Sequence, residues 1–329
     1  MARRTVPHPK IEGVGLHPKY LRYNIWNSEA SLSATTAEWS EHATPLPRPP
    51  PDEIHNPIVA QTIADNPTLF QIITPIKVDT FQHFLRDHPN QPFVESVCTG
   101  LREGFWPWAN TLQPTFPVTH DESAQARRTL NSETSDFFKG RLEVEQQHGR
   151  FSASLGTSLL PGMYCMPVYA VPKPGSTELR LVVDHSAGPF SLNSMIHHDS
   201  VTGFPLNNLT HLGEMLIQEH NTCNLPDGLV VWKSDIADAY RLCPMHPHWQ
   251  IKQAVQIGGQ YYIDRCNVIG SSVSGAIFIA VNSLIAWIAK NNRGIRRLAS
   301  YVDDSFGLAL RDDEEIYPPY RKPFPSPQA

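Results

Sequence analysis

Two short apolar runs flank a pair of adjacent acids near the end of the chain, a pattern that predicts a β-hairpin with carboxylates at its tip. The runs are residues 298–302 and 305–310, and the acids between them are Asp303 and Asp304. An Asp-Asp pair at a turn is common, because aspartate tolerates turn geometry. Taken alone, the pair is better explained as an ordinary turn than as a catalytic site.

A third carboxylate lies near the end of another apolar run. Residues 229–236 are rich in β-branched side chains and predict a buried strand that contains Asp235. A carboxylate at the end of such a strand loses hydration unless it is paired or bound to a metal. If this strand and the 298–310 hairpin share one sheet, Asp235 and Asp303 converge, with Cα atoms within about 10 Å of each other. That arrangement suits two Mg²⁺ ions about 3.5–4 Å apart, as phosphoryl transfer requires.

Two cationic residues flank a second predicted hairpin. Strands at 168–171 and 179–183 are separated by a turn signal at 173–176, with Lys173 and Arg180 on either side of it. A triphosphate needs cations on the side opposite its metals, and arginine grips phosphate oxygens bidentately whereas lysine acts as a point charge. Taken one at a time, each residue is better explained as part of a solvated hairpin tip.

The spacing of apolar residues predicts further elements along the chain. The aromatic run Phe105-Trp106-Pro107-Trp108 is of a kind that stacks on nucleic-acid bases, but such runs more often pack in a core. The expected helices are residues 78–85, 96–104, 131–148, 209–216 and 274–290, and a further strand is expected at 261–268.

Proline is concentrated towards the two ends of the chain. There are 30 prolines in 329 residues, beside an ordinary hydrophobic fraction of 40% and a charged fraction of 18%. We therefore expect one or two domains with a core, together with extended segments. The proline-rich stretch 45–51 favours polyproline II or disorder, and a plain linker explains it better than a docking motif.

Net charge and cysteine spacing narrow the classes of protein and site that the chain can represent. A net charge of −5 argues against binding nucleic acid by bulk attraction, but leaves a local basic groove open. The five cysteines form no CxxC pair, so neither a zinc site nor a disulfide framework is indicated. There is no secretory signal, and the apolar stretch 276–289 is too short to span a bilayer. We expect an intracellular protein, cytoplasmic or nuclear and not secreted, without a membrane partner.

The order of these motifs resembles the fingers and palm of reverse transcriptases, which are RNA-directed DNA polymerases. Residues 167–184 match the fingers hairpin of that family without a gap, and Tyr-x-Asp-Asp, here residues 301–304, is its hallmark. The resemblance covers residues 161–310, a little under half the chain. Segments 184–188 and 249–253 resemble elements of fungal genomes that are assigned to tyrosine-recombinase (DIRS-like) retrotransposons. The remaining matches are Lys173, Arg180, Asp184, Asp235-x-x-Asp238-Ala239-Tyr240 and residues 270–278.

The resemblance implies an α+β fold of the right-hand polymerase type, with an antiparallel palm sheet backed by helices at 209–220 and 274–290. Residues 159–311 would form the fingers and palm. The expected neighbours are a proline-rich, largely disordered region at 1–70, a helical region of unknown role at 71–158, and a disordered tail at 312–329.

The resemblance also implies a role for each matched residue, two Mg²⁺ ions (with Mn²⁺ as an alternative), dNTPs, and a primer on an RNA or DNA template. An aromatic ring at the sugar position excludes a 2′-hydroxyl and so selects deoxynucleotides, although Tyr240 also fits an ordinary core tyrosine. The implied catalytic metal ligands are Asp235 and Asp303, with Asp304 as a supporting acid and the backbone carbonyl of Ile236 as a further ligand. The implied nucleotide-binding residues are Lys173 and Arg180, which would hold the triphosphate, and Tyr240, which would be the steric gate. Gly270 would let the backbone approach template and nucleotide.

Two functions from different classes follow from these observations. The first is the polymerase module of a retroelement, and the second is a catalytically inert, truncated remnant that keeps the fold. Two observations motivate the second. These are that so few residues follow Leu310 that no thumb is expected among them, and that a net charge of −5 is unfavourable for the phosphate contacts on which primer-template affinity rests. A further departure is that the loop at 267–275 lacks the glutamine of many retroviral relatives.

Overall fold

The computed structural model describes residues 34–124, 132–173, 175–201, 203–222, 229–295, 297–310, 315–317 and 322–324. These residues form an α+β fold around one long helix, α9 (Ser274–Arg293), which the sequence predicted at 274–290. It is the one described helix long and apolar enough to cross a bilayer, yet 67% of its most apolar window is buried inside the protein. Its length and composition therefore reflect a place in the core.

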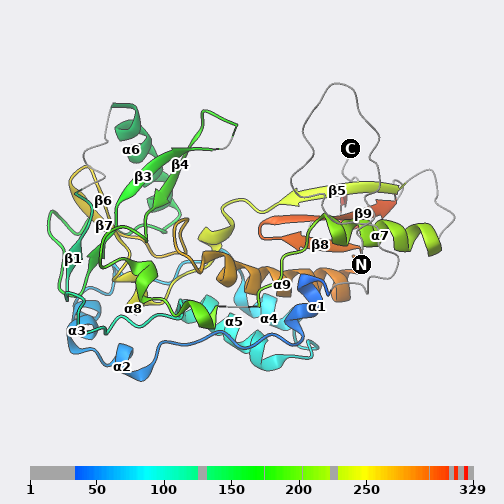
Figure 1. The fold of residues 1–329 in the computed structure, drawn as a ribbon, viewed down its shortest axis with the longest axis horizontal. Helices are drawn as coiled ribbons and strands as arrows, with labels where there is room; N and C mark the ends of the chain where they lie inside the picture. Colours follow the sequence, from blue (N-terminus) through cyan, green and yellow to red (C-terminus); the bar gives the residue numbers. More distant parts are fainter. Residues whose placement is uncertain are drawn as a thin grey trace, which may run out of the picture.

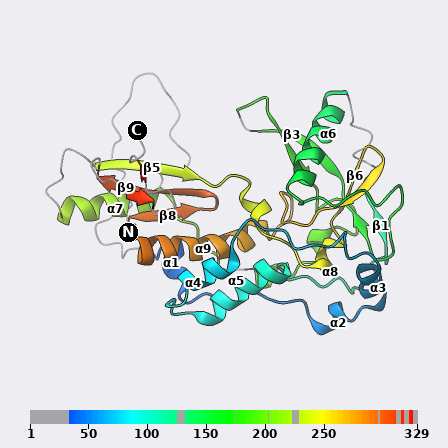
Figure 2. The same cartoon turned by 180° about the vertical axis from the view of Figure 1, so that it is seen from behind.

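A three-stranded antiparallel sheet lies over one half of α9 (Figures 1 and 2). Strand β9 (Asp304–Leu310) is central, with β5 (Leu229–Asp235) on one side and β8 (Leu298–Tyr301) on the other. Helix α9 contacts β8, and α7 (Leu209–Thr222) contacts β9. The predicted strands and backing helices are therefore present, and the acidic pair lies where β8 turns into β9.

The other half of the molecule carries the predicted hairpin of β3 (Val168–Pro172) and β4 (Leu179–Val183), on which α6 (Ser132–Gln147) packs. The strand predicted at 261–268 is shorter than expected, because β7 ends at Ile263 and the chain continues through buried polar residues. The neighbouring sheet has the order β1–β2–β6–β7, with β1 at His120–Asp121, β2 at Tyr164–Cys165, β6 at Ala254–Ile257 and β7 at Gln260–Ile263.

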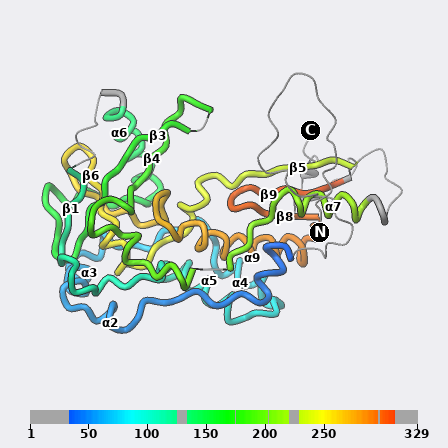
Figure 3. Tube along the Cα trace, in the orientation of Figure 1, coloured from blue at the N-terminus to red at the C-terminus, as the bar shows by residue number. Residues whose placement is uncertain are grey.

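The region from residue 34 to residue 70 differs from the disorder that its prolines predicted. Residues 34–70 run along the lower edge of the molecule from α1 to α3 (Figure 3) and bury Leu46 and Phe70. The reason is positional: Pro51 and Pro57 begin helices, where their missing N–H is not needed. Residues 1–33 lie outside the described part of the chain. The short helices here are α1 (Thr36–Ser40), α2 (Pro51–Ile54) and α3 (Pro57–Asp65).

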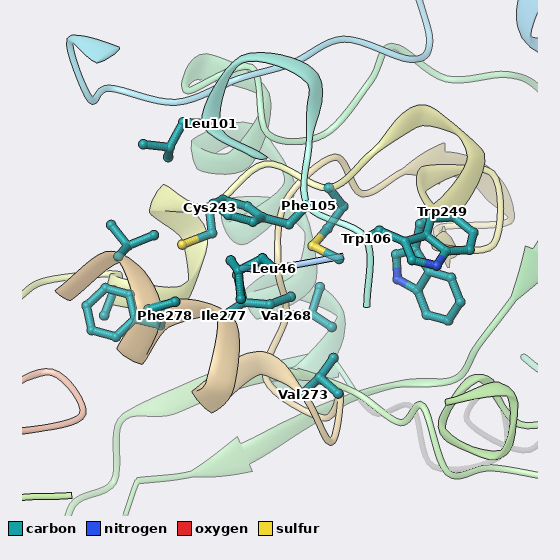
Figure 4. Packing of buried hydrophobic residues seen from close by; sticks show 14 of the residues in the cluster. Leu46, Leu101, Phe105, Trp106, Cys243, Trp249, Val268, Val273, Ile277 and Phe278 are labelled. Carbon is teal, nitrogen blue, oxygen red and sulfur yellow. The ribbon is translucent and has the colours of Figure 1, made fainter. Parts of the chain in front are cut away.

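Helices α4 (Val78–Phe84) and α5 (Gln91–Glu103) lie beneath α9, on the side away from the three-stranded sheet (Figures 1 and 2). Helix α5 ends at Gly104, as the sequence predicted. The aromatic run that follows belongs to the core, since Phe105 and Trp106 are buried in one cluster with Leu46 (Figure 4). The remaining helices are η2 (Leu192–Met195), η3 (His198–Ser200), η4 (Ala239–Leu242) and α8 (Pro247–Gln250).

The predicted tail also differs in part from disorder. Within residues 312–329, the described segments β10 (Glu315–Tyr317) and β11 (Lys322–Phe324) pair with each other as antiparallel strands. The rest of the tail lies outside the described residues.

Candidate active site

The backbone register brings the three predicted acids to one edge of the three-stranded sheet. Asp235, the last residue of β5, is directly opposite Asp304, the first residue of β9. Just beyond this pair, the backbone N–H of Ile236 donates to the carbonyl oxygen of Asp303 at 3.1 Å. Opposed Cα atoms are about 5 Å apart and consecutive ones about 3.8 Å. The Cα atoms of Asp235 and Asp303 are therefore at most about 9 Å apart, within the limit that shared metals impose.

The turn that carries Asp303 has a left-handed residue. Val302 and Asp303 connect β8 to β9, since Tyr301 pairs with Asp304, and Val302 has a φ of +54°. A β-branched residue rarely adopts this conformation, and such strain persists only where surrounding contacts hold it. One such contact comes from α9, where the buried Asn282 donates from Nδ2 to the carbonyl oxygen of Val302 at 2.9 Å.

The sequence showed Asn282 only as an interruption of an apolar helix. A polar side chain within a buried helix needs a hydrogen-bond partner, and that requirement was the one signal that pointed to a special role. The identity of its partner depends on the tertiary contact between α9 and the acidic turn.

Lys233 supplies positive charge to the acids. Its Nζ lies 2.9 Å from Oδ1 of Asp304. The hydrogen bond to Asp304 raises the pKa of Lys233, and the charges of Asp304, Asp235 and Asp303 add to this effect. Lys233 and Asp235 are two residues apart on β5, so their side chains leave the same face of the strand.

The donor chemistry at this edge fits a divalent cation. Carboxylate oxygens are the hard ligands that Mg²⁺ prefers; Asp235 is exposed, and Asp303 and Asp304 are half-buried. Among the described residues, however, no three His, Cys, Asp or Glu side chains gather closely enough to hold a metal ion. The backbone thus places the acids together, while the side chain of Asp304 is turned to Lys233.

Tyr240 lies next to the acidic turn. Its ring contacts that of Phe278 edge-on, with centroids 6.0 Å apart. Burial raises the pKa of its hydroxyl, and the charge of Asp303 raises that pKa further. Gly275 leaves room here, because a Cβ at this position would lie 3.8 Å from the hydroxyl of Tyr240. The half-buried tyrosine on η4 therefore packs against α9, with its hydroxyl near Gly275.

Gly270 makes a close backbone approach, but the approach that the structure shows is to β4. Its φ is +123°, and a Cβ would lie 1.8 Å from the carbonyl oxygen of Val183, so no side chain fits. Asn193 holds the same loop, donating to the carbonyl oxygen of Gly270 at 3.0 Å and accepting from the backbone N–H of Ser272 at 2.9 Å. The sequence did not identify Asn193, whose role depends entirely on long-range contacts.

Lys173 and Arg180 share one face of the β3–β4 hairpin but do not belong to the sheet of the acids. Val171 is opposite Arg180 in the register, and Lys173 follows two residues later on the same face. The ammonium of Lys173 pairs with Glu178 at 2.8 Å, and both cationic residues are exposed. The hairpin and the three-stranded sheet stand at opposite ends of the molecule, on the same side of α9 (Figure 1).

No protein-family model and no curated protein sequence matches the chain. Among solved structures, the chain is similar to the native protease-reverse transcriptase of prototype foamy virus, with 17% identity and a TM-score of 0.39 over 76% of this chain. A foamy viral protease-reverse transcriptase in complex with double-stranded DNA matches at 15% identity and a TM-score of 0.37 over 72% of this chain. The chain spans 32% and 39% of the lengths of these two proteins. At such scores the likeness is weak and partial.

Proposed function

We propose that the chain is the polymerase module of a retroelement reverse transcriptase, which adds deoxynucleotides to a primer on an RNA or DNA template. The observation that carries the proposal is the register of β5 and β9. It sets Asp235 opposite Asp304, with Asp303 in the turn beside them. Three carboxylates at one strand edge are the ligand type that two-metal nucleotidyl transfer uses. The fungal, tyrosine-recombinase type of element stays a prediction from the sequence.

The acids would hold the cofactor, which we propose to be two Mg²⁺ ions or, alternatively, Mn²⁺. Asp235 and Asp303 would be the principal ligands, with Asp304 in support and the backbone carbonyl of Ile236 completing one shell. When bound, the ions supply charge stabilisation at the attacking and leaving oxygens of the transfer. Because Asp304 is also the partner of Lys233, we assign it the lesser role.

The other residues would bind and select the nucleotide. Lys173 and Arg180, exposed on one face of the hairpin, would bind the triphosphate. Tyr240 would lie under the sugar and exclude a 2′-hydroxyl, a role supported by its position beside Asp303. Gly270, kept free of a side chain by Val183, would shape the loop that faces template and nucleotide.

The proposal includes an intracellular location. Cys98, Cys165, Cys243 and Cys266 are buried free thiols, the state expected in a reducing compartment. No membrane partner is proposed.

Primer extension tests the proposal directly. The purified full chain should extend a primer on an RNA and on a DNA template with dNTPs and Mg²⁺, and Asp303→Asn should abolish extension. Asp87→Asn is the matched control, because Asp87 is an exposed acid whose ion pair, among the described residues, is with its neighbour Arg86. The proposal is overturned if the wild type is as inert as Asp303→Asn, or if that variant extends primers as well as the wild type.

One observation favours a second candidate, a catalytically inert retroelement protein that keeps the fold. Asp304 is paired with Lys233, and within the described ranges no three potential ligands gather. An inert protein would bind Mn²⁺ no more tightly than its Asp303→Asn variant in a calorimetric titration. A clear loss of Mn²⁺ affinity in the variant would remove this observation in favour of the second candidate, and primer extension then decides between the two.

A further inference from the structure

A buried cluster of charges joins α6 to the segment that follows β5. Its centre is Glu145, whose carboxylate is contacted by three guanidinium groups and is fully buried. Two further acids balance the charge, so the cluster holds three positive and three negative groups. The nitrogen–oxygen distances to Glu145 are 2.6 Å for Arg141, 2.8 Å for Arg150 and 2.8 Å for Arg241. Arg241 is also 2.8 Å from Asp264, and Asp238 is 3.0 Å from Arg150 and 3.6 Å from Arg141. We call these six residues the Glu145 cluster.

The opposite charges of the Glu145 cluster compensate one another's loss of hydration. Burial by itself would raise the pKa of Glu145, but Arg241, Arg141 and Arg150 together bring it below its ordinary value. Removing one partner from such a cluster leaves an uncompensated buried charge, which is costly. The Nε of Arg150 contacts Glu145 as an ion pair without hydrogen-bond geometry, whereas its Nη2 donates to Glu145 at 3.2 Å.

The cluster connects two parts of the proposed nucleotide site. Helix α6, which carries Glu145, packs on both β3 and β4, the hairpin with Lys173 and Arg180. Asp238, at the other side of the cluster, lies between Asp235 and Tyr240 in the sequence. Arg150, which follows α6, reaches Asp238 with its Nη1. The helical region before residue 159, whose role the sequence left open, therefore contacts the segment that carries Tyr240.

Asp238 has a backbone conformation that needs support. Its φ is 52° and its ψ 31°, in the left-handed region, and it immediately precedes η4, which contains Tyr240. Its carbonyl oxygen accepts from the backbone N–H of Arg241 at 2.7 Å. Aspartate visits this region when its short side chain is held by local polar contacts. Here the closer contact to its carboxylate comes from Arg150, at 3.0 Å against 3.6 Å from Arg141, and the side chain of Arg150 is only 7% exposed and so has little freedom to move.

We propose that Arg150 is a positioning residue for sugar selection: by holding the carboxylate of Asp238, it fixes the left-handed turn that sets the ring of Tyr240. This inference rests on the proposed function, because selection matters only where Tyr240 meets a nucleotide. The discriminated ligands are deoxynucleoside and ribonucleoside triphosphates. Among the described residues, the side chain of Arg150 makes polar contacts to Glu145 and Asp238, and it reaches the turn before Tyr240 through Asp238.

A purely structural role for Arg150 predicts different behaviour. The side chain of Asp238 is 45% exposed, so water solvates it even without a partner. If the contact served stability alone, Asp238→Asn would lower the free energy of unfolding slightly and select nucleotides like the wild type. If the contact positions Tyr240, Asp238→Asn loosens the turn while the fold remains intact.

The test compares Arg150→Met, Arg150→Lys and Asp238→Asn in the full chain. Arg265→Lys is the control for altering a buried arginine, since the side chain of Arg265 binds the backbone carbonyls of Thr68, Leu69 and Gly149 and forms no ion pair with the Glu145 cluster among the described residues. The backbone N–H of Arg265 donates to the carbonyl oxygen of Arg150 at 2.9 Å, a bond that a side-chain substitution keeps. The readouts are the ratio of dNTP to rNTP incorporation and the hydrogen exchange of residues 238–243. The amides of Arg241 and Cys243 report the turn, because they donate to the carbonyls of Asp238 and Tyr240.

We expect Arg150→Met and Asp238→Asn to lower the incorporation ratio by roughly fivefold to tenfold, the scale of one hydrogen bond, and to speed exchange in 238–243. Arg150→Lys should keep most of the wild-type incorporation ratio and most of the wild-type protection from exchange. Arg265→Lys should change neither the ratio nor the exchange. The inference is overturned if Asp238→Asn and a folded Arg150→Met keep the wild-type ratio and exchange. If the wild type extends no primer, the proposed function fails and sugar selection with it, and the exchange data then decide whether Arg150 holds the turn.

Discussion

Asn282, in the middle of the buried helix α9, donates a hydrogen bond to the carbonyl oxygen of Val302 in the acidic turn. The strained backbone next to Asp303 is thus hydrogen-bonded to the long buried helix of the core. Because the direction of the Asp303 carboxylate depends on the turn, we expect the position of this carboxylate to depend on the hydrogen bond from the core helix.

We predict that Asn282→Ala reduces primer extension by more than tenfold while lowering the free energy of unfolding by only about 1–2 kcal/mol, the cost of one buried hydrogen bond. The measurements are steady-state extension and urea unfolding. Ser283→Ala is the control, because the hydroxyl of Ser283 bonds only back to the carbonyl oxygen of Ala280 in its own helix. Equal losses of activity in both variants would contradict a specific role for Asn282.

Gly270→Ala is expected to destabilise the protein by more than about 3 kcal/mol, because a Cβ would overlap the carbonyl oxygen of Val183 at a φ of +123°. Gly140→Ala provides the matched control. Gly140 lies in α6, and apart from its own helix no heavy atom of the described residues lies within 4 Å of the place that an alanine methyl would take, so alanine there should add about 0.5–1 kcal/mol of stability. Thermal unfolding of the two variants measures both effects, and a Gly270→Ala protein as stable as the wild type would refute the close approach.

The buried imidazole of His185 makes stability depend on pH. Neither of its ring nitrogens has a hydrogen-bond partner within the described residues, and burial lowers its pKa to about 3. The unfolded chain, in which histidine has its ordinary pKa of about 6.5, therefore binds the proton first as the pH falls. The stability that the neutral His185 contributes is fully present above the unfolded-state pKa of about 6.5. This contribution is lost progressively as the pH falls from there towards the folded-state pKa.

At pH 5 this loss amounts to about 2 kcal/mol relative to pH 7. Urea unfolding of the wild type and of His185→Leu at the two pH values measures it, and the difference between the two pH values should be smaller in the variant by about 2 kcal/mol. His55→Leu, at an exposed position, should leave the difference unchanged. A His185→Leu variant that keeps the whole wild-type difference would show that His185 is not buried in its neutral form.

Lys233 is expected to compete with divalent cations for the acids, because its ammonium bonds Asp304 and lies in the field of Asp235 and Asp303. Lys233→Met should therefore bind Mn²⁺ more tightly, by up to about fivefold for an exposed pair. Calorimetric titration with Mn²⁺ alone measures this without reference to turnover. Lys290→Met is the control, since Lys290 pairs with Glu38 instead. Unchanged or weaker Mn²⁺ binding in Lys233→Met would count against the competition.

Periodicity and turn chemistry were sufficient to predict the local elements of the site. The apolar run before Asp235, the 298–310 hairpin and the helix at 274–290 all appear within a few residues of their predicted bounds. These features have local causes, because the spacing of neighbouring apolar side chains determines which face is buried, and the residue types at a turn determine which backbone geometry it can adopt. The proline-rich segment at 34–70 departed from prediction because proline also starts helices, and only packing decides between the two outcomes.

By itself, the sequence determined which residues carry charge and which strands and helices hold them. It also determined the order of Lys173, Arg180, Asp235 and the 303–304 pair that motivates the polymerase proposal. Only the tertiary structure decided that Asp235 is opposite Asp304, that Asn282 holds the acidic turn, and that Arg150 reaches Asp238. The physical reason is that strand register, buried hydrogen bonds and ion pairs join residues far apart in the chain, where no local pattern of side chains records the partner.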